Sequence, residues 1–254
     1  MDAKQFRSRA LVTVAAAVMI ATLSISAAVA AGARQAAAPL PSLPVRLQQM
    51  RHHYLEVTRV QEALIRGDLA AVRAPARALG EMPTPDGAPL ASLRYLVGLT
   101  VAGRQAARAP SLAIAATSVG SMLVQCGRCH RAMGVMPFPE TTAKPDVGGI
   151  VGHMLEHQVA IEDMVQGLVM PSDTHWQRGI DRLRSAPLQT GDLPADRRLS
   201  QQVRQAETEV HRIVDRAASA ATDIERADAY ARLLTTCAEC HSLHRTIWGP
   251  TPKQ

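Results

Sequence analysis

The pattern Cys-x-x-Cys-His occurs twice in this chain of 254 residues, as CGRCH at 126–130 and as CAECH at 237–241. Together the two copies use all four cysteines of the sequence. Two disulfide bonds would also use four cysteines, but they would leave the histidine after each pair unexplained. Any fold of this chain therefore has to present two thiols and one imidazole together, at two places.

Cys-x-x-Cys-His is the sequence that attaches c-type haem. On a helix, Cys126 and His130 are four residues apart and share a face, while Cys129 lies on the neighbouring stripe. The thiols can then bond to the two vinyl groups of a porphyrin while the imidazole reaches its iron. We predict two covalently attached haem c groups. The residues that attach them or bind their iron are Cys126, Cys129, His130, Cys237, Cys240 and His241.

Two other uses of the cysteines fit the sequence less well. A zinc site built from both Cys-x-x-Cys pairs has suitable local spacing, but it requires the two halves to meet and leaves both histidines without a role. A redox-active dithiol of the thioredoxin type requires an α/β fold, for which the sequence has no strand pattern. Haem attachment is the interpretation that uses every residue of the motif.

The chain also carries an internal repeat. The segments QMRHHYLEV (49–57) and HMLEHQVAI (153–161) align so that His53 falls on His157. The two haem motifs lie slightly farther apart than these segments, and we place the extra residues of the second half in a longer connection around 185–196. We therefore infer a tandem duplication, with one motif at the end of each half.

The apolar residues of each half recur at steps of three and four, which predicts helices and no sheet. Ser111 is a predicted N-cap, and the spacing of Thr222 and Glu225 is that of a capping box. The expected helices are 46–64, 68–80, 88–108 and 111–133 in the first half, and 150–168, 172–185, 196–219 and 222–245 in the second.

We therefore predict an all-α fold of two tandem four-helix bundles, each with Cys-x-x-Cys-His on its fourth helix. The predicted segments are a signal peptide at 1–30, a flexible lead-in at 31–41, a first haem-binding bundle at 42–133, a proline- and glycine-rich linker at 134–149, and a second haem-binding bundle at 150–254.

The N-terminus is predicted to direct export. Lys4, Arg7 and Arg9 precede an uncharged run at 10–29, and the small residues of AVA (28–30) form a cleavage pattern. The run is also long enough to cross a bilayer, so an uncleaved membrane anchor is the alternative. We expect a periplasmic protein, with membrane contact only if this segment stays uncleaved.

The second iron ligand of each haem is predicted to come from the first helix of the same half. His53 and His157 lie on the apolar faces of these helices, and in an up-down-up-down bundle the first helix starts beside the end of the fourth. Met50 and Met154 repeat equally well one turn earlier and are the alternative ligands. An open sixth position is the third possibility. The remaining histidines are expected at the surface: His52, His153, His175, His211 and His244.

A four-helix bundle with Cys-x-x-Cys-His near the end of its fourth helix resembles the class II c-type cytochromes, the cytochrome c-prime group. RLQQM (46–50) is similar to the Arg-x-x-x-Met of low-spin members, whose methionine binds iron. The second half has Ile150 in place of that arginine, and both halves place a histidine three residues past the methionine. The resemblance implies the bundle fold, haem attachment and an ability to form homodimers, while these departures favour ligation by two histidines.

The predicted function is transport of single electrons between redox partner proteins, without enzymatic activity. Two alternatives follow from an open iron site: binding of NO or CO, as in five-coordinate members of the resembled family, and a dihaem peroxidase. The net charge of +6 does not indicate a nucleic-acid partner, because the propionates of two haems would offset most of the charge of the exported chain.

Overall fold

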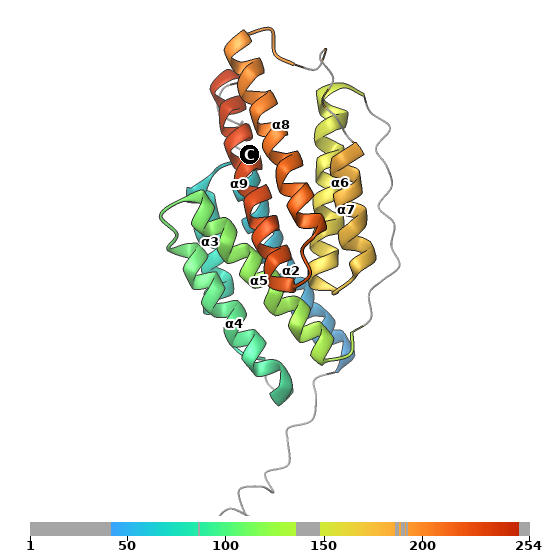
Figure 1. The fold of residues 1–254 in the computed structure, drawn as a ribbon. Coiled ribbons are helices and arrows are strands. Elements are labelled where there is room, and N and C mark those ends of the chain that lie inside the picture. The colour runs from blue at the N-terminus through green and yellow to red at the C-terminus, as the bar shows by residue number, and fades with distance from the viewer. Residues whose placement is uncertain are drawn as a thin grey trace, which may run out of the picture. The chain divides into compact units, whose positions relative to one another are not determined.

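The computed structural model describes residues 42–248 except 86, 136–147, 186, 187, 189, 190 and 192. Within them the chain forms helices and no strand, which confirms the all-α prediction. The predicted signal peptide and lead-in, and most of the predicted linker, lie outside the described residues. The helices are α2 (Leu43–Ile65), α3 (Leu69–Glu81), α4 (Leu90–Ala107), α5 (Leu112–Ala132), α6 (Gly149–Val169), α7 (Asp173–Ser185), α8 (Arg197–Ala218) and α9 (Asp223–Trp248) (Figure 1).

Side-chain caps fix two of the helix starts that the sequence predicted. The Ser111 hydroxyl accepts a hydrogen bond from the Ile114 amide at 3.3 Å, at the start of α5. At the start of α9, the Thr222 hydroxyl accepts from the Glu225 amide at 3.2 Å, and the Glu225 carboxylate accepts from the Thr222 amide at 2.9 Å. The predicted N-cap and capping box are therefore confirmed.

The extra length of the second half is divided between a helix and a connection. Helix α8 has 22 residues, whereas α4, its counterpart in chain order, has 18. The connection 186–196 is also longer than the connection 82–89. Our placement of all the extra residues in the connection was therefore wrong in part, since an uninterrupted helix absorbs an insertion of about one turn without losing its apolar face.

The helices of the two halves pack against each other. In each half every helix contacts the next one along the chain, and the first helix contacts the fourth. The most extensive contact between the halves joins α5 to α9, the two helices that carry the Cys-x-x-Cys-His sequences, and it is flanked by contacts of α2 with α9 and of α5 with α6 (Figure 1). The chain from residue 41 onward is accordingly one compact unit.

A single apolar core runs through both halves. Fully buried side chains of the first half, such as Leu64 and Met122, belong to the same cluster as Met164 and Leu234 of the second. By length and composition α5 is apolar enough to cross a membrane, but half of its apolar stretch is buried inside the protein. We therefore regard α5 as the central helix of this core.

A glycine permits the close approach of the two motif helices. A Cβ atom at Gly120 of α5 would lie 2.7 Å from the carbonyl oxygen of Ala227 in α9, closer than real Cβ atoms come. Polar contacts also join the halves: the buried Gln61 amide donates to the Tyr230 hydroxyl at 2.5 Å, and Arg128 pairs with Asp223 at 2.8 Å. The relative placement of α5 and α9 is thus determined by both packing and hydrogen bonds.

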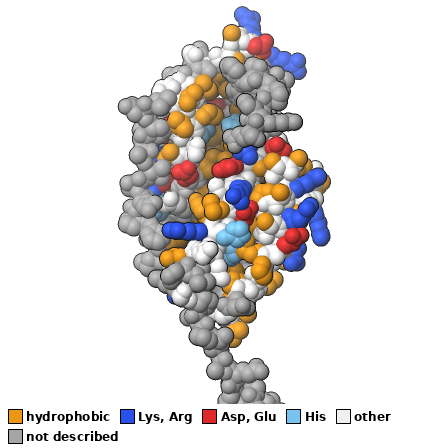
Figure 2. All heavy atoms as spheres, turned by 180° about the vertical axis from the view of Figure 1, so that it is seen from behind, with side chains coloured by type: hydrophobic (Ala, Val, Ile, Leu, Met, Phe, Trp, Pro, Cys, Tyr) orange, Lys and Arg blue, Asp and Glu red, His pale blue; other side chains and the backbone are white. Residues whose placement is uncertain are grey.

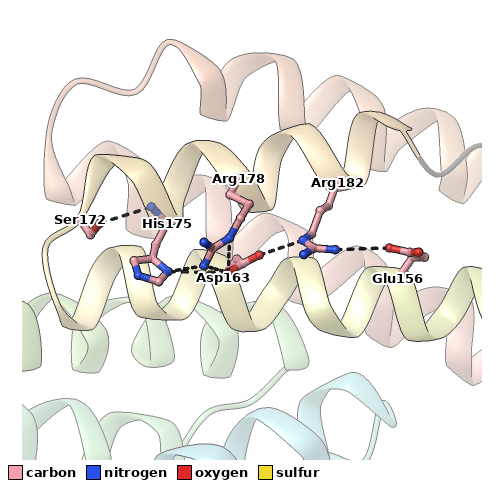
Figure 3. Close-up of polar contacts among 6 residues, drawn as sticks. All are labelled: Glu156, Asp163, Ser172, His175, Arg178 and Arg182. Atoms are coloured by element: carbon pink, nitrogen blue, oxygen red, sulfur yellow. Dashed lines mark hydrogen bonds and ion pairs between the residues drawn. The ribbon is translucent and has the colours of Figure 1, made fainter. Parts of the chain in front are cut away.

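A buried carboxylate joins α6 to α7 (Figure 3). Asp163 of α6 is completely buried and accepts hydrogen bonds from the guanidinium groups of Arg178 and Arg182, with Nε distances of 2.9 and 3.0 Å. Arg178 also donates to His175 Nδ1 at 2.6 Å, and Arg182 lies 3.8 Å from Glu156. Opposite charges of α6 and α7 therefore lie beside one another, and each compensates the free-energy cost of burying its neighbour.

The placement of His175 at the surface was wrong. Its side chain is buried on the inner face of α7, 3.7 Å from the Asp163 carboxylate. Nδ1 of this buried imidazole accepts a hydrogen bond from Arg178, one turn further along α7, and Arg178 in turn is held by Asp163 of α6.

Replacing Asp163 with Asn should lower the free energy of unfolding by about 3 kcal/mol, because two arginines would lose their buried counter-charge. Urea unfolding of the full chain, followed by circular dichroism, measures this change. Asp181→Asn on the exposed side of α7 is the matched control and should cost less than about 0.5 kcal/mol. Equal losses in the two variants would contradict a stabilising role for the buried charge.

Candidate functional site

The second half contains a cavity of about 30 Å³ between α6, α8 and α9. It receives side chains from the first helix of this half and from the helix that carries its haem motif. On the face drawn in Figure 2, histidine side chains lie among hydrophobic ones. The residues that line the cavity are Ile150, His153, Met154, His157, Leu188, Val203, Ala206, Glu207, Val210, Thr236, Cys240 and His241.

His157, the predicted distal ligand, has a buried nitrogen without a hydrogen-bond partner. The side chain is 8% exposed, and its Nε2 finds no donor or acceptor within the described part of the chain. The pKa of His157 is lowered from 6.5 to about 4, mainly by burial and secondly by the neighbouring His153. The imidazole is therefore neutral at physiological pH, with an unpaired ring nitrogen that a metal can use.

The same cavity receives the end of the second haem motif. Cys240 and His241 reach it from α9, so the structure brings together His157 and the motif's histidine, as the repeat predicted. Met154 lines the cavity as well, one turn before His157. The choice between these two distal ligands remains a prediction, and the unpartnered nitrogen favours His157.

Sequence reasoning missed a polar cluster beside His157. His153, expected at the surface, is buried, with its ring centroid 4.2 Å from that of His157. Its Nε2 lies 3.3 Å from one carboxylate oxygen of Glu207, and the other oxygen is 3.3 Å from Nε2 of His211. The surface assignment of His153 was wrong because α8 covers this side of α6 with an acceptor, which the periodicity of α6 alone could not show.

These side chains form a set of possible metal ligands. One ligand atom each from His153, His157 and Glu207 lie within 4.8 Å of one another. Burial raises the pKa of Glu207, but hydrogen bonding to His153 and the charges of nearby histidines outweigh it, so the net pKa is lowered. The signals in the sequence were the four-residue spacings of His153 with His157 and of Glu207 with His211.

The first half orients its predicted ligands in a related way. His53 is buried, and burial, followed by the charge of the exposed His52, lowers its pKa. Met50, by contrast, is 38% exposed. The inward histidine and outward methionine of α2 favour His53 over Met50 as an iron ligand, and the surface position expected for His52 is confirmed.

The histidine of the first motif is held by a backbone carbonyl. Nδ1 of His130 lies 2.8 Å from the carbonyl oxygen of Val169, the last residue of α6. A carbonyl can only accept, so Nδ1 carries the proton and the lone pair is on Nε2. This is the arrangement by which metal-binding histidines are oriented.

All four cysteines are free thiols. Burial raises the pKa of Cys126 and of Cys237 to about 12, and it also raises the pKa values of Cys129 and Cys240. A redox-active dithiol or a reactive cysteine has a lowered pKa. The environment of these thiols therefore does not favour thiol redox chemistry.

Comparison of the chain with models of known protein families, with curated proteins and with solved structures finds no match.

Replacing His157 with Gln should flatten the pH dependence of stability in the haem-free chain. A histidine with a folded pKa near 4 is protonated first in the unfolded chain, so the wild type loses up to about 3 kcal/mol as the pH falls from about 6.5 to about 4. Urea titrations at several pH values measure this slope. His52→Gln at the exposed neighbour of His53 is the control, and identical slopes for all three chains would contradict the burial of a neutral His157.

Proposed function

We propose that the protein is an exported dihaem c-type cytochrome that carries single electrons between redox partner proteins and catalyses no reaction of its own. Its two halves act as tandem four-helix haem bundles with a common core. The observation that carries the proposal is the second-half cavity, where the unpartnered nitrogen of His157 lies with Cys240 and His241 of the haem motif.

The residues of each motif suit covalent attachment. Each cysteine thiol would add across one vinyl group, with sulfur bonding to one carbon and the thiol hydrogen going to the other, so that no electrons are gained or lost. The thiols are protonated at neutral pH because burial raises their pKa values. Attachment at two neighbouring positions of one helix would then fix the haem relative to α5 or α9.

Two histidines would be available to bind the iron of the second haem and would leave no position for another ligand. His241 belongs to the attachment motif, and His157 approaches the same cavity from α6. The haem iron, when bound, supplies the one-electron Fe(II)/Fe(III) couple, and two imidazoles without a methionine favour a lower potential. A closed coordination sphere supports electron transport over the binding of NO or CO and over peroxidase chemistry.

A metal ion bound directly by the protein is a second candidate. It is favoured by the buried group of His153, His157 and Glu207, which resembles the nitrogen and oxygen sets that hold divalent transition metals. This candidate and the haem proposal exclude each other at the second site, because His157 cannot bind both ions. It leaves both Cys-x-x-Cys-His motifs without a role, and we therefore place it second.

The chain secreted by a host that attaches c-type haem should contain two haems per polypeptide. Absorbance of the pyridine haemochrome divided by protein concentration measures this ratio, and Cys126→Ser with Cys129→Ser should reduce it to one. The reduced spectrum should stay unchanged when CO is added. A haem-free protein that binds one divalent ion would support the second candidate instead, and a CO-dependent shift would support gas binding.

The distal ligand of the second haem can be tested one residue at a time. His157→Ala should convert one of the two haems from low-spin to high-spin and allow it to bind CO, because an iron position opens. Met154→Ala and His153→Ala, in the same cavity, are the matched controls and should keep both haems low-spin. A high-spin haem in Met154→Ala and none in His157→Ala would replace our ligand with the methionine.

A further inference from the structure

We propose that the second half of the chain positions the iron-binding histidine of the first haem, so that the reduction potential of this haem depends on the end of α6. The inference rests on the proposed function, since it concerns a haem held by the first motif. Its basis is the hydrogen bond between the imidazole of His130 and the carbonyl of Val169, which crosses from one half to the other.

The carbonyl of Val169 is available because of its place in α6. It belongs to the last residue of the helix, and the last four carbonyls of a helix have no partner within it. These groups also carry the partial negative charge of the helix dipole. The end of α6 therefore offers His130 an acceptor stronger than an isolated carbonyl, and the donated proton satisfies a group that would otherwise need water.

Gly127 allows this contact to form. It lies inside the first motif, and a Cβ atom there would be 2.1 Å from the carbonyl oxygen of Leu168 and 3.4 Å from Cγ of Pro171. No side chain fits at the first of these distances, so α5 reaches the end of α6 only with glycine at this position. The second motif has Ala238 at the equivalent place, so this close approach belongs to the first motif.

The contact has an electronic consequence for the bound iron. A histidine that donates Nδ1–H to a strong acceptor becomes a more basic ligand through Nε2. A more basic ligand stabilises Fe(III) relative to Fe(II) and lowers the reduction potential. The Val169 carbonyl is thus a positioning group: it fixes the ring of His130 and lowers the potential of the first haem without touching the iron.

Helix α6 then serves both haems. His157 faces the second site, and Val169 contacts the histidine of the first, twelve residues further along the same helix. At 1.5 Å per residue the two positions are about 18 Å apart along the helix axis. One rigid helix would therefore carry His157, which would bind the second haem, and Val169, which orients the histidine that would bind the first.

The test is the potential of each haem in the full holoprotein with both haems attached. Gly127→Ala should move one of the two redox waves to higher potential and leave the other in place, because the added methyl group separates His130 from Val169. A chain with Cys237→Ser and Cys240→Ser holds only the first haem and identifies its wave. In proton NMR, the His130 ring N–H of Gly127→Ala should also exchange faster with solvent.

Further variants separate positioning from packing. Pro171→Gly loosens the end of α6 without adding an atom, and it should raise the same wave even if Gly127→Ala does not fold. Asp223→Asn weakens the contact of α5 with α9 but leaves the His130 contact intact, so both waves should stay in place. Gly148→Ala, with open space around its Cβ, should also change neither wave.

Two outcomes would overturn the inference while leaving the proposed function standing. In the first, two haems are present but neither Gly127→Ala nor Pro171→Gly moves a wave. In the second, Asp223→Asn moves the first wave as far as these variants do, which would assign the effect to general packing. Failure of the proposed function is separate, since the wild-type chain would then show no haem waves at all.

Discussion

The contact between α5 and α9 is the constraint on which the rest of the structure depends. The two helices approach so closely that Gly120 has no room for a side chain beside Ala227, and Arg128 and Asp223 pair at the same interface. Because each of these helices carries one Cys-x-x-Cys-His, their packing places both motifs in one core. Further contacts then form between the halves, such as the hydrogen bond of Gln61 with Tyr230.

The two halves form different contacts at positions that the predicted repeat aligns. Asp163 is buried between two arginines of α7, whereas its repeat counterpart in α2 is the exposed Arg59, which pairs with Glu56 of its own helix. Helix α6 is therefore joined to α7 by buried charges, whereas Arg59 forms its ion pair within α2. Buried charges require defined geometry, and these lie on the same helix as His157, the proposed distal ligand.

The sequence was sufficient for the fold class and the helices, and it singled out His157, Cys240 and His241, which line one cavity. Periodicity predicted each helix to within a few residues, because the apolar face of a helix can be read from the sequence of that helix alone. The caps at Ser111 and Thr222 also involve only residues that are close in sequence. The burial of His153 and His175 was not predictable in this way. The carboxylates that lie beside them, Glu207 and Asp163, come from other helices, and single-helix patterns contain no information on what covers the polar side.

The contact of His130 with Val169 lay beyond sequence reasoning for a similar reason. A backbone carbonyl has no sequence signature, and Gly127, which makes room for it, occupies a position of the motif that any residue can fill.

The shared core also has a consequence for electron transport under the proposed function. Two haems on separate bundles joined by a linker would exchange electrons only when the bundles met. Two haems attached to helices that pack together keep a fixed separation, so transfer between them would depend on potential and distance and not on domain motion. Under the proposed function, the duplication therefore makes a paired carrier whose two potentials are set within one rigid unit.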